Sequence, residues 1–312
     1  MGEHTHTLPD LVVILGPTAS GKSALGISLA LRLRGEIVSA DSRQVYRGLD
    51  IGTAKVSLAE QALVPHHLLD IVDPREVYTV AQFQQDAFAA INMILARGAQ
   101  PFLIGGSPHY IQAVVDHLDI PRIPPQPVLR AQLEAQPLPQ LLAQLEELDP
   151  RGAATIDRNN PRRVIRALEV SIASGKPFSQ QSGRAAPLYR CLLLGIQWPR
   201  DLLYQRIDTR IDERMRQGLV REVRALLDQG ISYERLEGLG LEYRFVSLWL
   251  RDQFASEAEM VQRLKYASHD FTRRQLTWFR RDRRIVWLDG SDDSEGMVVE
   301  AARIIQTFLD KH

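Results

Sequence analysis

The 312-residue sequence has a single cysteine, no excess of charge of either sign and few aromatic residues. The lone Cys191 excludes a disulfide within the chain and is typical of a reducing compartment. No apolar run reaches the roughly 18 residues that a membrane-spanning helix needs. The polar N-terminus, residues 1–9, also lacks the basic start and apolar stretch of a secretion signal. We therefore expect a cytoplasmic protein that does not associate with membranes.

The charge of the chain is balanced, with 38 basic and 38 acidic residues. A net charge of zero argues against a nucleic-acid binder, because phosphate contacts favour a basic surface. However, the arginines are unevenly distributed and gather at residues 158–166 and 273–284. We expect Trp278 and Phe279 in the second group to be core residues, with the arginines facing outward toward phosphate.

The first motif is a glycine-rich turn, G-P-T-A-S-G-K-S, at residues 16–23, called the phosphate loop below. It follows the apolar run 11–15 and precedes the apolar-periodic stretch 24–33, as at a strand-to-helix junction. Glycines let backbone N–H groups point inward, the helix N-terminus adds partial positive charge and lysine adds a full charge. The motif predicts a phosphate cradle with a hydroxyl for Mg²⁺ at Ser23. The predicted cradle residues are Gly16, Thr18, Ala19, Ser20, Gly21, Lys22 and Ser23.

Two other turns are expected at the same edge of a parallel sheet. The predicted strand 35–40 ends at Asp41, and the predicted strand 101–104 ends at a Gly-Gly turn followed by Ser107. Ligands of open parallel sheets bind beyond the carboxyl ends of the strands. From the residues alone, Asp41 is a helix N-cap, a carboxylate facing Mg²⁺ or a catalytic group. Ser107 either belongs to a plain strand–helix turn or presents its hydroxyl to the ligand.

The pattern of the whole chain predicts an α/β fold. We expect a P-loop NTPase-like parallel sheet core flanked by helices, with a helical insertion domain. The core comprises residues 10–116 and 187–312, and the insertion comprises residues 117–186, where prolines separate short helical stretches and no strand pattern is present. Further strands are expected at 189–197 and 284–289. Helices are expected at 79–97, 162–174, 200–217, 219–229, 242–250, 257–281 and 295–310.

With these motifs in view, the chain resembles the tRNA dimethylallyltransferases (tRNA isopentenyltransferases) over most of its length. The matching stretches are G-P-T-A-S-G-K-S at 16–23, D-S-R-Q-V-Y-R-G-L-D-I-G-T-A-K at 41–55, P-H-H-L-L-D at 65–70, P-R-R-V-I-R-A-L-E at 161–169, R-I-D-T-R-I-D at 206–212 and R-Q-L-T-W-F-R-R-D at 274–282. The chain departs from the family at 105–110, where G-G-S-P-H-Y replaces G-G-T-G-L-Y. It departs again at 240–244, where G-L-E-Y-R replaces the familiar I-G-Y-K.

The resemblance implies an enzyme that transfers a dimethylallyl group from dimethylallyl diphosphate to a tRNA and releases pyrophosphate. The acceptor is the exocyclic N6 of the adenosine 3′-adjacent to the anticodon. Asp41 would act as the base, while Ser107 and Arg210 would join the phosphate loop and Mg²⁺ in neutralising the leaving pyrophosphate. The protein is expected to act as a monomer. The residues implied to contact the anticodon stem-loop are Asp41, Ser42, Arg43, Gln44, Arg130, Arg162, Arg163 and Arg166.

Three other functions stay open on the sequence. A small-molecule kinase would use the same loop, but it usually has an apolar strand ending in a Mg²⁺-holding aspartate, whereas the strand 101–104 ends in glycines. An adenylate isopentenyltransferase would share the chemistry, but its small acceptor needs no helical insertion. A nucleotide-dependent switch protein is disfavoured because no N-K-x-D guanine motif is visible.

Overall fold

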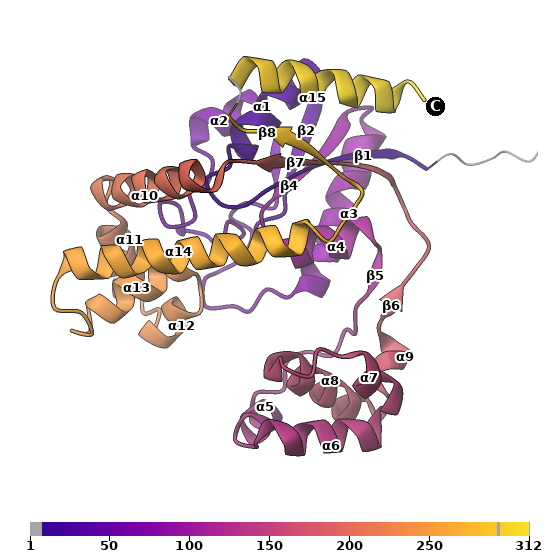
Figure 1. Ribbon diagram of the computed structural model, residues 1–312, viewed down its shortest axis with the longest axis vertical. Helices are drawn as coiled ribbons and strands as arrows, with labels where there is room; N and C mark the ends of the chain where they lie inside the picture. The colour runs from indigo at the N-terminus through magenta and orange to yellow at the C-terminus, as the bar shows by residue number, and fades with distance from the viewer. Residues whose placement is uncertain (1–7, 292–293, 312) are drawn as a thin grey trace, which may run out of the picture. The chain divides into compact units, whose positions relative to one another are not determined.

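The computed structural model describes residues 8–291 and 294–311, so most of the polar segment 1–9 lies outside the described residues (Figure 1). The chain divides into two compact units. The core unit is formed by Met1–Ile111 with Leu188–His312, and the insertion unit is formed by Gln112–Pro187. The predicted insertion, 117–186, falls inside the second of these units.

In the described part of the core unit, six strands form one parallel sheet in the order β3-β2-β4-β1-β7-β8. The central strand β1 is a continuous apolar run, buried from Leu11 to Leu15, as expected where helices cover both faces of a parallel sheet. Apart from the two-residue β3, these strands confirm the sequence prediction. Their bounds are β1 Asp10–Leu15, β2 Gly35–Ser39, β3 His66–His67, β4 Gln100–Gly105, β7 Arg190–Gln197 and β8 Ile285–Asp289.

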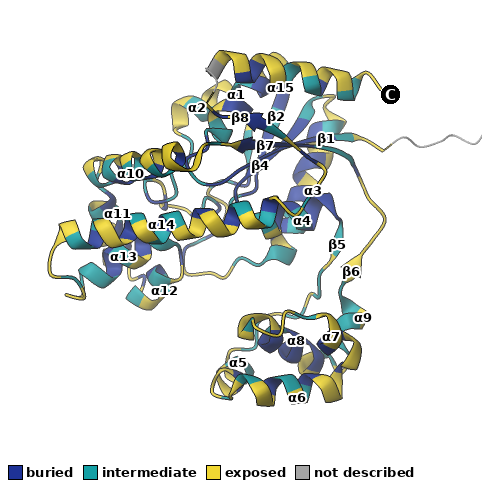
Figure 2. Cartoon of the chain, in the orientation of Figure 1, coloured by how far each residue is buried: buried dark blue, intermediate teal, exposed yellow. Residues whose placement is uncertain are grey.

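Helices cover both faces of this sheet. On one face, α1 (Lys22–Arg32) and α15 (Ser294–Leu309) share an apolar cluster with alternate residues of the strands. On the other face lie α3 (Val80–Ala96) and α4 (Pro108–Val115) (Figure 1). Figure 2 shows the buried residues following the strands and the inward sides of these helices. Because helices cover both faces, polar side chains can bind a ligand at the ends of the strands.

A second group of helices in the core unit packs beside the phosphate loop and the loop that follows β2. Val45 and Leu49 of that second loop are fully buried against Leu219, Val223 and other apolar residues of these helices. The sequence predicted the longer helices and missed the two shortest, α2 and α12. The bounds of this group are α10 Arg200–Gln217, α11 Leu219–Asp228, α12 Tyr233–Glu237, α13 Leu241–Trp249 and α14 Glu257–Phe279. Helix α2, Leu58–Leu63, contacts α1 instead.

The insertion unit is helical around its own apolar core, which includes Leu133, Leu145, Val164 and Leu168. Its helices are α5 Pro127–Glu134, α6 Leu138–Leu148, α7 Pro150–Thr155, α8 Pro161–Ser174 and α9 Phe178–Gln181. The expectation of no strand was wrong at one place. Leu118–Asp119 (β5) and Gly183–Arg184 (β6) form a short antiparallel pair. Strands of two residues are too short for an alternating pattern to show.

None of the described helices, in either unit, has the length and apolar character needed to cross a membrane.

The fold makes a prediction about Gly105, the last residue of β4. A Cβ at this position would lie 2.1 Å from the carbonyl oxygen of Ala40, which is backbone and cannot rotate away. We expect Gly105→Ala to lower the free energy of unfolding by about 2 kcal/mol or more, measured by denaturant unfolding. Gly183→Ala is the control, because nothing lies within 4 Å of a Cβ there. Equal stability of the two variants would contradict the packing described.

Candidate active site at the carboxyl edge of the sheet

The phosphate loop connects β1 to α1, as its sequence predicted. Ala19 and Gly21 adopt positive φ angles of 61° and 94°. Two side chains hold the outward carbonyls of the loop: Trp198 Nε1 donates to Ser20 O at 2.9 Å, and Arg206 Nε donates to Ala19 O at 3.0 Å. Because a trans peptide directs its N–H opposite to its C=O, the N–H of Gly21 points to the other side of the loop. No side chain caps α1 at Gly21, so the N–H groups of its first turn are oriented to bind an anion.

Three basic side chains gather beside this loop. Burial and the nearby Arg210 lower the pKa of Lys22 to about 8, while Asp41 opposes the shift. Burial and the neighbouring Arg214 likewise lower the pKa of Arg210 to about 10. Arg214 is itself buried and paired with Glu242. Cations that are crowded and partly desolvated in this way are typical of a site for an anion with several charges.

Asp41 lies directly after β2, at the same edge. Its Oδ1 accepts hydrogen bonds from the backbone N–H groups of Arg43 at 2.8 Å and Gln44 at 3.4 Å. The residues after it form a turn, so the alternative of a helix N-cap is wrong. Oδ2 has no hydrogen-bond partner within the described ranges. One oxygen therefore orients the carboxylate and the other stays available to a substrate.

Ser107 joins the turn after β4 to the turn after β2. Its Oγ accepts from the backbone N–H of Ser42 at 3.1 Å and lies 3.4 Å from the Ser42 hydroxyl. The backbone before this turn is also paired, since Ala40 N–H donates to Ile104 O at 2.7 Å. The structure thus brings together the three turns that the sequence placed at one edge.

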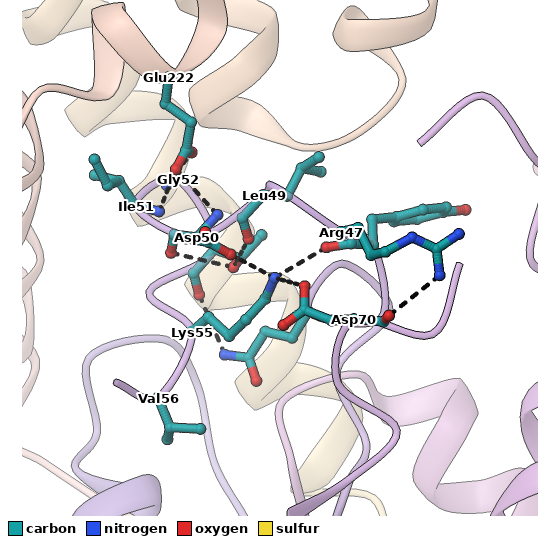
Figure 3. A network of polar contacts seen from close by, with 12 residues as sticks. Arg47, Leu49, Asp50, Ile51, Gly52, Lys55, Val56, Asp70 and Glu222 are labelled. Carbon is teal, nitrogen blue, oxygen red and sulfur yellow. Dashed lines mark hydrogen bonds and ion pairs between the residues drawn. The ribbon is translucent and has the colours of Figure 1, made fainter. Parts of the chain in front are cut away.

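The loop 47–55 is held by a residue that sequence reasoning missed, Glu222 on α11 (Figure 3). Its carboxylate accepts from three consecutive backbone N–H groups, at 3.0, 2.7 and 3.0 Å, and from the Tyr243 hydroxyl at 2.7 Å. The three donors are Asp50, Ile51 and Gly52. The sequence gives no sign of this role. Glu222 lies 170 to 172 residues from its three backbone donors, and a glutamate on a helix is usually solvated.

This loop in turn positions Gln44. Its Nε2 donates to the carbonyls of Thr53 at 3.3 Å and Ala54 at 3.2 Å, and its Oε1 faces Ser39 Oγ at 3.3 Å. Lys55 closes the loop, with its Nζ 2.6 Å from Asp50 and 2.5 Å from Asp70 (Figure 3). The Gln44 side chain is therefore fixed in place beside Asp41.

The arginines of the insertion unit fall into two groups. Arg130 and Arg166 each direct a guanidinium nitrogen to the fully buried Glu169, at 2.7 and 2.6 Å. Arg162 and Arg163, at the first turn of α8, are exposed and have no ion-pair partner among the described residues. Arg130 and Arg166 thus stabilise the unit, and contact with RNA stays a prediction for all four.

Comparison with known proteins identifies the family. A family model described as IPP transferase matches residues 44–282, more than half of the chain. This chain belongs to the IPP transferase family. It is similar to the tRNA dimethylallyltransferase of Thermomicrobium roseum, with 47% identity over 283 residues that cover 89% of this chain and 86% of that protein.

Two solved structures of the family share the fold. The full-length tRNA isopentenylpyrophosphate transferase of Bacillus halodurans is 38% identical, with a TM-score of 0.73 over 97% of each chain. A eukaryotic dimethylallyltransferase, solved acting on tRNA, is 26% identical, with a TM-score of 0.82 over 97% of this chain and 80% of that chain. The prediction of a prenyl-transferring enzyme with a P-loop-like α/β fold is confirmed over that of a kinase.

The lowered pKa of Lys22 predicts how anion binding depends on pH. With a pKa of about 8, the Lys22 side chain of the ligand-free protein is about nine-tenths charged at pH 7 and about one-tenth charged at pH 9. A bound anion favours the charged form, so binding takes up a proton above pH 8 and weakens as the pH rises. Isothermal titration with pyrophosphate gives the dissociation constants of Lys22→Met and of the wild type. The ratio of the first to the second should fall about tenfold between pH 7 and pH 9. A ratio that does not change with pH would contradict the assignment.

Proposed function

We propose that this enzyme transfers a dimethylallyl group from dimethylallyl diphosphate to N6 of the adenosine 3′-adjacent to the anticodon of tRNA, releasing pyrophosphate. The observation that carries the proposal is that a cationic site for phosphate and a carboxylate that can act as a base lie at the same edge of the sheet. Lys22 and Arg210 provide a cationic phosphate site, and the Asp41 carboxylate lies close enough to influence the pKa of both. The relatives named tRNA dimethylallyltransferase support tRNA as the acceptor.

Asp41 is proposed as the base. The lone pair of an adenine amine is delocalised into the ring, so the amine is a poor nucleophile unless a base accepts a hydrogen bond from it and then its proton. Oδ2 of Asp41 can accept both, because Oδ1 alone holds the turn. The N6–carbon bond forms as the carbon–oxygen bond to the diphosphate breaks, and the proton passes from N6 to Asp41.

The leaving group is proposed to sit in the phosphate loop. As the carbon–oxygen bond breaks, negative charge grows on the diphosphate, and preorganised donors stabilise it. These donors are the backbone N–H groups of residues 21–23, together with Lys22 and Arg210, because the N–H of Ser20 already donates to Pro17 O. The cationic site is built before the substrate arrives, so no reorganisation is needed during the reaction.

A magnesium ion fits this arrangement. No group of three histidine, cysteine or acidic side chains suited to a metal is found among residues 8–291 and 294–311. A metal must therefore take most of its ligands from the diphosphate and water, as Mg²⁺ usually does. Ser23, in the first turn of α1, would hold it through its hydroxyl, and the ion when bound would neutralise charge on the leaving pyrophosphate.

The tRNA is proposed to contact Asp41, Ser42, Arg43 and Gln44 in the base pocket and Arg162 and Arg163 on the insertion unit. The target base must leave its stack, which costs only a few kcal/mol in a loop that is already poorly paired. Both Nε2 hydrogens of Gln44 are donated to carbonyls, so its Oε1, which already accepts from Ser39, is left with one lone pair that could accept from a base. The enzyme is proposed to act as a monomer.

The direct test is to incubate the protein with labelled dimethylallyl diphosphate, Mg²⁺ and unmodified tRNA, then to digest the RNA and identify its nucleosides. Label in N6-dimethylallyladenosine is expected. A parallel incubation contains AMP in place of the tRNA. Label transferred to AMP but not to tRNA would contradict the proposal in favour of an adenylate isopentenyltransferase.

Asp41→Asn tests the base. The amide oxygen of asparagine can still accept from the backbone N–H groups of the turn, so the loop is retained while the proton acceptor is lost. We expect kcat to fall by about 10²-fold to 10⁴-fold, with the pyrophosphate dissociation constant changed less than about threefold. Rapid-quench kinetics and titration calorimetry measure the two quantities. A loss confined to pyrophosphate binding would show that Asp41 serves the phosphate site instead.

Arg163→Ala tests the RNA surface. Removal of one exposed phosphate contact should weaken tRNA binding and reduce the slope of log K against log salt by about 1. KM for dimethylallyl diphosphate should not change. Arg166→Ala is the comparison, because it breaks the pair with buried Glu169 and should mainly lower the melting temperature. Equal loss of affinity for both substrates in Arg163→Ala would rule out the assigned role.

A further inference from the structure

Gln275 links two of the turns that form the active site, although it lies on α14, the long helix that crosses the core unit in Figure 1. Its Oε1 accepts from the backbone N–H of Thr18 in the phosphate loop at 3.2 Å. Its Nε2 donates to the carbonyl of Gly106, in the turn after β4, at 2.6 Å. The side chain is buried, with 5% of its surface exposed. Both ends of a buried amide are therefore engaged by backbone, and neither can pair with water instead.

The turn after β4 lies directly against the phosphate loop at this point. A Cβ on Gly106 would lie 3.1 Å from the carbonyl oxygen of Gly16, 3.1 Å from Gln275 Nε2 and 3.5 Å from Lys22 Cε. A side chain at this position would be packed more tightly than is usual, so the two turns are held close together by their backbone and by the Gln275 bridge. Thr18 was predicted to belong to the phosphate cradle, and its backbone N–H is occupied by this bridge.

The hydrogen bonds of the Gln275 bridge continue toward Asp41, the proposed catalytic base. Ser107, the residue after Gly106, accepts from the N–H of Ser42 at 3.1 Å, and Ser42 follows Asp41. A series of hydrogen bonds thus runs from the phosphate loop, through Gln275 and the Gly106–Ser107 turn, to the Asp41 turn. Of these segments, the phosphate loop carries groups proposed to bind the leaving diphosphate, and the Asp41 turn carries the proposed catalytic base.

We propose that Gln275 is a positioning residue that sets the distance and orientation between the diphosphate site and Asp41. The inference rests on the proposed function. Both polar ends of Gln275 are engaged by backbone groups, so its loss should leave each binding site intact and misalign the two sites relative to one another. Misalignment of reacting groups by about 1 Å can cost about 10²-fold in rate.

Gln275→Met tests this role, because methionine has nearly the same size and makes neither hydrogen bond. Single-turnover rates with dimethylallyl diphosphate and tRNA are measured beside pyrophosphate affinity and melting temperature. We expect the rate to fall by about 10-fold to 100-fold, with pyrophosphate affinity within about threefold of the wild type. Thr272→Val is the matched control. It lies one turn earlier on the same helix and its hydroxyl, fully buried, has no partner in the part of the chain that is described, so its rate should equal that of the wild type.

A double variant separates positioning from a general effect on folding. If Gln275 acts through the turn of Ser107, the rate loss in Gln275→Met with Ser107→Ala should be clearly smaller than the product of the two single losses. Independent, multiplicative losses, a wild-type rate in Gln275→Met, or an equal loss in Thr272→Val would each overturn the inference. If Gln275→Met does not fold, Gln275→Glu, which keeps the size and the acceptor toward Thr18, is measured under the same criteria. If the wild-type protein transfers no dimethylallyl group when it is given dimethylallyl diphosphate together with tRNA, the proposed function is overturned, and this inference with it.

Discussion

The close parallel packing of β2, β4 and β1 is the constraint on which the site depends. Leu15 pairs with Gly105, and Ser39 pairs with Ile104, so these strands deliver their following turns to one edge. Gly105 admits the backbone of Ala40 at a distance that a larger residue would prevent. Without this spacing, Ser107 could not hold the turn of Asp41, and the carboxylate would not lie within reach of the cations beside the phosphate loop.

The electrostatics of this edge favour ligand binding over stability. Lys22 and Arg210 are partly desolvated and close to further positive charge, so the folded chain disfavours their charged forms. Glu242 pairs with the neighbouring Arg214 and opposes only part of the lowering of the Arg210 pKa. In the proposed reaction, an incoming diphosphate would supply the missing negative charge. Binding would then relieve a repulsion built into the fold, and the same cations would stabilise the charge that develops as pyrophosphate leaves. The residues proposed for this chemistry all belong to the core unit, and contact with RNA is proposed for Arg162 and Arg163 of the insertion unit.

The sequence predicted the elements whose signals are local. The phosphate loop has a motif, its flanking strand and helix have clear periodicity, and Asp41 and Ser107 could be placed because carboxyl ends of parallel strands share an edge. The elements that the sequence missed, β3, α2, α12 and the β5–β6 pair, are too short for periodicity to show. Gln275 and Glu222 could not be predicted as bridging residues, since their partners are distant in sequence and a polar residue on a helix gives no sign of being turned inward. Arg166 belongs to the family stretch 161–169, and the resemblance also implied a role for Arg130, but only the structure shows that both face Glu169.

The central claim is that the phosphate loop holds the leaving group while Asp41 faces the accepting base. A crystal structure with a non-reactive thio-analogue of dimethylallyl diphosphate and an unmodified anticodon stem-loop tests it most directly. The account predicts the diphosphate within hydrogen-bond distance of Lys22 and of the N–H groups that begin α1, and adenine N6 about 3 Å from Asp41 Oδ2. A diphosphate bound elsewhere, or an Asp41 carboxylate turned away from the adenine, would contradict it.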